Sequence, residues 1–445
     1  MGEQFAQGAT HALLVQLGQL AGKTSSLLAA SLAPTVRALD GLPGKSIEQA
    51  HAELWRRFVD PKWFTLYDHA GLNGEVILPT PEECQSNIPN AMSWDISITD
   101  GSMFGGMYLE AAIHRWQISG SAEDREKAHR VAKGLMKLAT VGQTKGFLAR
   151  GVTADGAAHY PLSSNDQAMP WLYGMWRYLR SGIPDAAACR LIQAKIIEVL
   201  EVLRHHGWKV PGDRPPFDSF GDFASFGWQG SSRLLFLLKL AAVVSGEPHW
   251  EGLYRQALVE KNPKGTGSRL EFCARGMISA LQSYHTWTHC PGVAGLRGLW
   301  EMETDPALRA AFAQGLKASA MVAAASLPLA AQFDNDDQRY FLLDWRKLNS
   351  LWCEQRSVRE AVDLAQKQLT LLDSLSPRRV YEIQFMREPL FAAWVITLCP
   401  EPAVLQQFAP DILKVIAHFR YDRLYTSQFF PAELAYYRLK QAGLA

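Results

Sequence analysis

A helix–turn–helix pattern that recurs along the chain limits its fold more than any other sequence feature. The copies, clearest first, lie at 114–132, 176–194, 239–257, 297–315, 348–366 and 392–410. In three clear copies an apolar helix pattern stops at Ser-Gly, and in the fourth the turn is Thr-Asp; Asp, Glu or Pro opens the next helix pattern. Gly suits the left-handed end of a helix, and acidic residues and Pro suit a first turn. The pattern predicts six helical hairpins, with turns about 45 to 65 residues apart.

The segments between hairpins indicate how the hairpins are arranged. Six hairpins can stack as an open solenoid or close into a ring. Long linkers rich in Gly, Trp and Asp, such as residues 207–230, join one hairpin to the next. A solenoid usually has short, similar connections, whereas a barrel carries its site on elaborated loops at one end. The sequence therefore predicts an all-α fold: an (α/α)6 toroid over residues 91–445, with residues 1–90 as an N-terminal helical arm packed on it.

Composition and charge exclude several classes of partner. Apolar residues make up 48% of the chain, and its formal net charge is +1, so it lacks the basic excess typical of nucleic-acid binding. Its six cysteines are scattered without a C-x-x-C pair, which argues against a zinc site or a disulfide framework. Neither a secretory signal nor an apolar run of membrane-spanning length is evident. We therefore expect a cytoplasmic monomer or homodimer that binds neither nucleic acid nor membrane.

Two segments resemble a known superfamily. They are "TDGSMFGGMYLEAAIHRWQISGSAEDREKAHRVAKGLMKL" and "GFLARGVTADGAAHYPLSSNDQAMPWLYGMWRYL". Together they resemble the six-hairpin glycosidases, most of all the unsaturated glucuronyl hydrolases, the rhamnogalacturonyl hydrolases and some β-glucuronidases. The order of helical hairpins is similar over residues 90–400, but sequence motifs are similar only over residues 99–179. The resemblance implies a glycoside hydrolase of polysaccharide degradation that acts on uronic-acid-containing oligosaccharides through two aspartates.

Asp100 and Asp166 are the candidate catalytic pair. Each lies at the start of a predicted inner helix, and consecutive inner helices of a toroid are neighbours, so both carboxylates should reach one cleft. Paired acids in unlike surroundings allow acid and base catalysis at neutral pH. Asp166 precedes an aromatic helix, so burial should keep its proton available, whereas Asp100, flanked by Gly101 and Ser102, should remain hydrated and ionised. The resemblance also implies that the later aspartate is the acid/base. Each residue could instead be an ordinary helix cap.

The predicted substrate contacts are one arginine and several aromatic residues. The guanidinium of Arg150 suits a uronate carboxylate; alternatively it ties its loop to Asp100 or Asp166. Aromatic rings can pack against the apolar face of a sugar. The candidates near helix starts or in linkers are Trp94, Phe104, Trp171, Phe220, Trp228 and Trp287, of which only a minority should contact ligand.

His285 and His289 are the basis of an alternative function. Four residues apart, they fall on one helical face. They could bind sugar hydroxyls, or one of them could be the base of a polysaccharide lyase or a sugar epimerase with the same fold. A second alternative is a non-enzymatic helical-repeat scaffold, although long aromatic linkers do not favour one.

We predict no metal and no cofactor, so activity should survive treatment with a chelator. The histidine pair lacks an accompanying acidic ligand, and the acidic run at 334–337 lacks the Gly and Glu of a calcium loop. Turnover of a glucuronide before and after EDTA treatment checks this. Activity that is lost to EDTA and restored by Zn²⁺ or Ca²⁺ would overturn the two-carboxylate mechanism.

Overall fold

The computed structural model describes residues 42–277 and 286–445, and these residues are mostly helical. Among them the only paired strands form an antiparallel hairpin of β1 (Lys209–Pro211) and β2 (Ser219–Asp222) within the long linker at 207–230. The all-α class is therefore confirmed. Across the described ranges, no helix is both long enough and apolar enough to cross a membrane.

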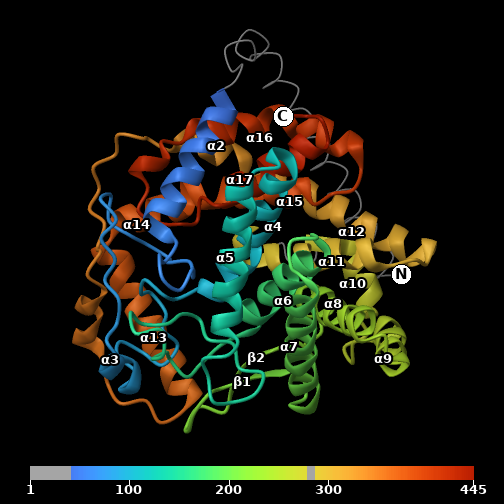
Figure 1. Cartoon of the computed structure of the whole chain (residues 1–445), viewed down its shortest axis with the longest axis horizontal. Coiled ribbons are helices and arrows are strands. Elements are labelled where there is room, and N and C mark those ends of the chain that lie inside the picture. The colour runs from blue at the N-terminus through green and yellow to red at the C-terminus, as the bar shows by residue number, and fades with distance from the viewer. Residues whose placement is uncertain (1–41, 278–285) are drawn as a thin grey trace, which may run out of the picture.

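Five helix pairs occupy positions where the repeat predicts hairpins (Figure 1). They are α4 (Gly101–Ser119) with α5 (Ala122–Leu138), α6 (Asn165–Arg180) with α7 (Ala186–His205), α8 (Trp228–Ser245) with α9 (Pro248–Val259), α11 (Thr286–Met302) with α12 (Pro306–Ala324), and α15 (Glu388–Thr397) with α16 (Pro402–His418). Gly120 and Gly246 end their helices at φ values of 64° and 71°. The side chains of Asp185 and Asp305 cap the helices that follow them. The predicted turn chemistry is confirmed at these four residues.

The predicted hairpin at 348–366 is wrong. The 3-10 helix η5 (Trp345–Leu351) is followed by an extended segment and a single helix, α13 (Val358–Leu375). Contacts with the N-terminal part of the chain hold η5 in place: Trp345 Nε1 donates to the Ile77 carbonyl at 2.7 Å, and Arg346 pairs with Glu83 at 2.6 Å. This long-range packing replaces the predicted helix pair.

A sixth helix pair joins two distant parts of the chain. α2 (Leu42–Glu53) packs against α17 (Pro431–Gln441) and α16, and Figure 1 shows these three helices side by side. His51 Nδ1 lies 3.0 Å from Glu433 Oε2 across the contact. Within the predicted arm, the described residues 54–90 hold only the π-helix η2 (Leu54–Phe58) and the short α3 (Pro81–Gln85) as helices.

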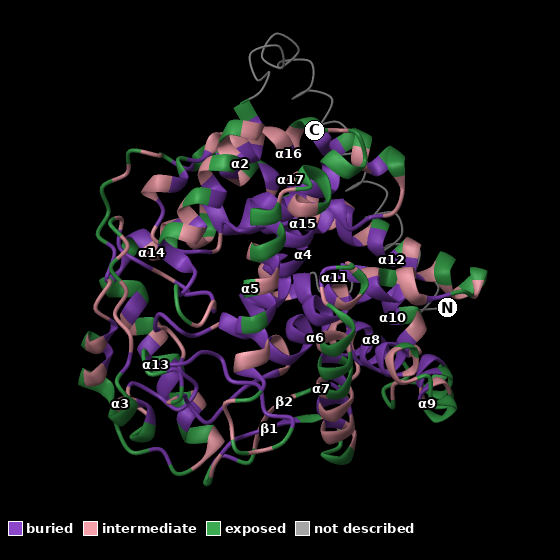
Figure 2. Cartoon of the chain, in the orientation of Figure 1, coloured by how far each residue is buried: buried purple, intermediate pink, exposed green. Residues whose placement is uncertain are grey.

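The core lies between the most deeply buried helices, which Figure 2 shows in purple. α4 contacts α6 and α17, α8 contacts α11, and α15 contacts both α11 and α17. The α4–α6 contact depends on two glycines: a Cβ on Gly106 would lie 2.3 Å from the Pro170 carbonyl oxygen, and one on Gly174 would lie 2.2 Å from that of Gly106. The aromatic side chains of α6 are buried in this core.

The remaining helices are short or lie at the edge of the core. They are α10 (Arg269–Arg275), η4 (Leu327–Gln332), α14 (Pro377–Glu382), the π-helix η6 (Ile383–Arg387) and η7 (Tyr421–Arg423). α14, η6 and α15 follow one another without a break.

Candidate functional site

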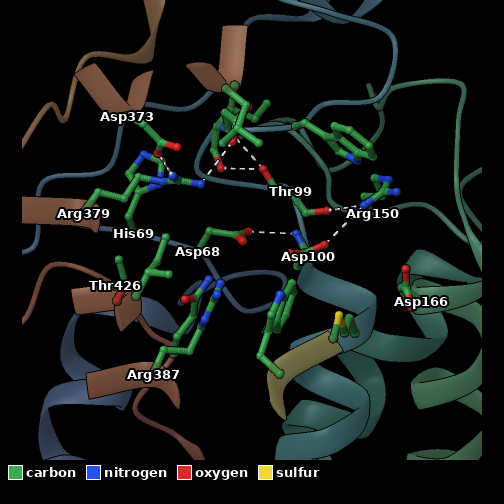
Figure 3. Close-up of a pocket in the computed structure, with 18 of the residues that line it drawn as sticks. Asp68, His69, Thr99, Asp100, Arg150, Asp166, Asp373, Arg379, Arg387 and Thr426 are labelled. Atoms are coloured by element: carbon green, nitrogen blue, oxygen red, sulfur yellow. Dashed lines mark hydrogen bonds and ion pairs between the residues drawn. The ribbon is translucent and has the colours of Figure 1, made fainter. Parts of the chain in front are cut away.

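A cavity of about 620 Å³ lies where α4, α6 and α11 begin, and Figure 3 shows many of its lining residues. It is lined by five aspartates and three arginines: Asp68, Asp95, Asp100, Asp166 and Asp373, with Arg150, Arg379 and Arg387. Aromatic rings from Trp94, Phe220, Trp287 and Phe341 complete much of its wall. The cavity thus combines ionisable groups with apolar ring faces.

Asp68 and Asp100 are neighbours in the cavity wall. Asp100 Oδ1 accepts from Gln167 Nε2 at 2.6 Å and from Arg150 Nη1 at 3.2 Å, while the Asp100 amide donates to Asp68 Oδ1 at 2.8 Å (Figure 3). Burial raises the pKa of Asp100, although the charge of Arg150 opposes this. Burial and the nearby Asp100 charge raise the pKa of Asp68 well above its usual value. This pair therefore retains a proton at a higher pH than ordinary aspartates.

The expectation that Asp100 is hydrated is wrong. Gly101, which was expected to leave Asp100 open, instead allows two backbone segments to cover it: a Cβ on Gly101 would lie 2.6 Å from the Arg150 carbonyl oxygen and 3.2 Å from that of Leu66. The Asp100 side chain is 13% exposed. It also makes no capping hydrogen bond to α4, so capping does not account for it.

The expectation that Asp166 is desolvated is also wrong. Its side chain is 49% exposed and pairs with Arg233 Nη2 at 2.8 Å. Asp166 lies in the first turn of α6, whereas the aromatic residues that suggested burial lie farther along and face the core. Asp100 and Asp166 do line one cavity, as predicted, but their surroundings are the reverse of those expected.

Arg150 is held by the protein itself. Its Nη1 donates to the Thr99 carbonyl and to Asp100, each at 3.2 Å, and its Nη2 donates to Ser164 Oγ at 3.1 Å. Its side chain is 4% exposed. These contacts favour the alternative in which Arg150 fixes its loop to Asp100.

Arg387 is a buried cation of the cavity with fewer protein partners than Arg150, and the sequence did not predict it. Its Nη2 donates to Glu388 Oε1 at 3.1 Å, and its guanidinium lies 4.8 Å from the Trp287 ring centroid. Its Nε, like that of Arg150, has no hydrogen-bond partner among the described residues. Burial lowers its pKa to about 10, so it remains charged at neutral pH. Arg387 ends the π-helix η6, a geometry frequent at functional sites. The sequence signal for it was the charged pair Arg387 and Glu388 inside the otherwise apolar segment "FMREPLF".

Asp95 and Arg379 form a second charged group that was not predicted. Arg379 donates to Asp95 at 3.2 Å and to Asp373 at 2.6 Å, so two carboxylates compensate its charge. Burial raises the pKa of Asp95 to about 6, with Arg379 opposing the shift. Asp95 has a φ of 69°, the left-handed region that non-glycine residues rarely adopt outside functional or strained sites.

Of the six aromatic candidates, Trp94, Phe220 and Trp287 line the cavity. Trp94 and Phe220 meet edge to face at 6.2 Å between ring centroids. The other three, Phe104, Trp171 and Trp228, are buried core residues, because their helix faces point into the interior. Phe104 still supports the site indirectly, since its ring packs edge-on against that of Trp287 at 6.1 Å.

Of the two histidine candidates, only His289 belongs to the described residues, and it is not brought into the cavity. His289 is buried in α11, where its Nδ1 lies 2.7 Å from Gln229 Nε2, and it does not line the cavity. His285 lies outside the described residues. His69 does line the cavity, and burial lowers its pKa to about 3, so it is neutral at physiological pH.

Within residues 42–277 and 286–445, no group of three or more His, Cys, Asp or Glu side chains is placed to hold a metal ion. In the acidic run at 334–337, Asp337 pairs with Arg339 and Arg378, and Asp336 pairs with Arg420. Arginine partners rather than a calcium-loop geometry therefore account for these two aspartates.

No protein-family model, curated protein or solved structure matches the chain. The cavity itself offers a proton donor in the Asp68–Asp100 pair, a solvent-accessible carboxylate in Asp166, a cation with an unfilled donor in Arg387, and aromatic faces.

Proposed function

We propose that the chain is a glycoside hydrolase that acts on uronic-acid-containing oligosaccharides, with this cavity as its active site. The observation that carries the proposal is the contrast between two aspartates of one cavity: Asp100 is buried with a raised pKa, and Asp166 is half-exposed. Glycosidases need one carboxylic acid and one carboxylate beside the scissile bond. The resemblance of residues 99–179 to the six-hairpin glycosidases agrees with this reading.

The surroundings of the aspartates determine their roles. Asp100, adjacent to Asp68, donates the proton, because burial favours its neutral form. Asp166, which is open to solvent and paired with Arg233, activates water. On a saturated uronide the proton goes to the glycosidic oxygen, and water attacks the anomeric carbon. On an unsaturated uronide the proton goes to the vinyl ether carbon and water adds to the neighbouring carbon; the resulting hemiketal then collapses and releases the aglycone.

Arg387 is the residue that binds the carboxylate of the acidic substrate. A buried arginine with an unfilled donor can bind a carboxylate through charge-assisted hydrogen bonds. Arg379 is compensated by Asp95 and Asp373, and Arg150 is held by hydrogen bonds to Thr99, Asp100 and Ser164. Arg387 pairs only with the adjacent Glu388 among the described residues. The uronate carboxylate therefore lies beside Arg387, with Trp287 beneath the guanidinium.

The finer architecture that we propose is a closed six-helix ring of α4, α6, α8, α11, α15 and α17. Its support is that each of these helices contacts the next in this order and α17 contacts α4. α2 takes the outer position beside α17. In such a toroid the N-terminal ends of the inner helices open into a central cleft, where Asp100, Asp166 and Trp287 lie.

We expect the protein to hydrolyse para-nitrophenyl β-glucuronide or an unsaturated uronyl disaccharide. An Asp166→Asn variant should be about 100-fold slower. This loss is at the lower end of the range for acid–base residues, because water reaches this half-exposed side chain. Release of nitrophenol and loss of ultraviolet absorbance by the ring double bond are the readouts. A lyase would instead create that absorbance from a saturated polysaccharide. Absence of hydrolysis on every uronide, or a wild-type rate in Asp166→Asn, would contradict the proposal.

A further inference from the structure

A second cavity, of about 270 Å³, lies toward the other end of the helices that line the first. α4, α6 and α11 present Asp100, Asp166 and Trp287 to the first cavity near their N-terminal ends, and their later turns line the second. Its lining includes six charged residues: Arg177, Arg180, Arg297, Arg438, Glu110 and Glu301. None of them belongs to the proposed active site.

Positive charge exceeds negative charge in this cavity. Glu301 accepts from Arg177 at 2.5 Å and from Arg297 at 2.7 Å, and Glu110 accepts from Arg438. Arg180 approaches Glu301 only to 3.6 Å. Four guanidinium groups thus face two carboxylates. His114 adds no charge at neutral pH, because burial lowers its pKa to about 3.

The buried arginines repel one another and keep unfilled donors. Burial lowers the pKa of Arg297, and the positive charges of Arg438 and Arg177 lower it further. Among the described residues, Nε of Arg177 and Nε of Arg438 have no hydrogen-bond partner. Helix C-termini do stabilise cations, but only within about the last turn. Arg177, Arg180 and Arg438 lie in the last turns of α6 and α17, where the helix dipole stabilises them, whereas Arg297 lies more than a turn before the end of α11 and gains no such stabilisation.

We propose that this cavity binds a small dianionic oxyanion: inorganic phosphate or the phosphate group of a small monoester. An ion with two negative charges neutralises the excess of the four arginines over the two glutamates. Its oxygens accept from guanidinium groups in the geometry that arginine offers to phosphate. The cavity has room for a phosphate and the start of an attached group. The amides of Gln117 and Gln441 supply neutral polar groups at its edge.

Calorimetric titration of the full chain with inorganic phosphate, against chloride at equal ionic strength, tests the proposal. We expect phosphate binding, weakened at least about tenfold in Arg297→Gln and several-fold in Arg180→Ala. The Arg180 side chain is 54% exposed and makes a 3.6 Å ion pair with Glu301 and a cation–π contact with Trp176 at 5.0 Å, so this variant should fold normally. Arg359→Ala, at a side chain that is 91% exposed and outside both cavities, is the matched control and should bind like the wild type.

An Arg387→Ala variant shows which cavity the anion occupies. It should bind phosphate like the wild type, because Arg387 lines the first cavity. Loss of binding in Arg387→Ala, equal binding in all variants, or no phosphate binding at all would overturn the proposal. Glycerol 3-phosphate in place of phosphate distinguishes the two sources: tighter binding identifies a monoester, and equal or weaker binding identifies the free ion.

Discussion

Replacing Asp100 with Asn should lower kcat on a glucuronide by about 10²- to 10⁴-fold, the range typical of a general acid. Asn has nearly the same shape and can still accept hydrogen bonds from Gln167 and Arg150, but it carries no proton to donate. In the wild type, kcat/KM should fall as pH rises through the raised pKa of the Asp68–Asp100 pair, because only the protonated form is active. Steady-state rates across a pH series provide the measurement.

The same substitution should not destabilise the fold at neutral pH. The folded protein raises the pKa of Asp100 above its usual value of 3.8, so the stability associated with its neutral form is present below that value and is lost as pH rises through the raised pKa. Asn stays neutral throughout. The thermal midpoint of Asp100→Asn should therefore equal or exceed that of the wild type at pH 7. It should be lower than that of the wild type only at acidic pH.

Asp363→Asn is the matched control, since this side chain is 63% exposed and makes only a 3.9 Å ion pair. It should change neither kcat nor the thermal midpoint. An Asp100→Asn variant that turns over at the wild-type rate would remove Asp100 from the mechanism. One that no longer folds would make it a structural residue.

Replacing Arg387 with Ala should lower kcat/KM for a glucuronide about 30-fold or more. Truncating one partner of a buried charge pair costs about 2 to 5 kcal/mol, and each 1.4 kcal/mol is about tenfold. The matching glucoside lacks the carboxylate, so its slower turnover should change little. Paired kcat/KM measurements on the two para-nitrophenyl substrates give the comparison.

An Arg150→Ala variant shows whether Arg150 or Arg387 binds the uronate carboxylate. Because Arg150 donates to Asp100, Thr99 and Ser164, its loss should slow both substrates by a similar factor. Arg420→Ala, which changes a half-exposed arginine outside the cavity, should affect neither. The opposite result, in which Arg150→Ala slows only the glucuronide and Arg387→Ala slows both substrates equally, would make Arg150 the residue that binds the uronate carboxylate.

Local chemistry made much of the fold predictable. The turns at Gly120, Gly246, Asp185 and Asp305 are encoded by residues within a few positions, so the sequence pattern locates five helix pairs. The predicted hairpin at 348–366 is absent because contacts of Trp345 and Arg346 with residues far earlier in the chain fix that segment.

The site was less predictable because burial depends on distant segments. The sequence around Asp100 suggests an open turn, yet the backbones of Leu66 and Arg150 cover it. Asp68 and Arg387 come from segments outside the resembling motif, and only folding brings them to the same cavity (Figure 3). A one-dimensional pattern identifies the chemistry of a side chain, but its solvation is a property of the assembled structure.

The pairing of α2 with α17 has a consequence for how the chain is made. His51 and Glu433 are 382 positions apart, so the ribosome must synthesise nearly the whole described chain before α2 finds its partner. Until then the surfaces of α4 and α15 that α17 covers stay exposed to solvent. Contacts of such long sequence separation slow folding and prolong the exposure of apolar surface during synthesis. The closing step of folding therefore depends on α17, which is synthesised after all the other described helices.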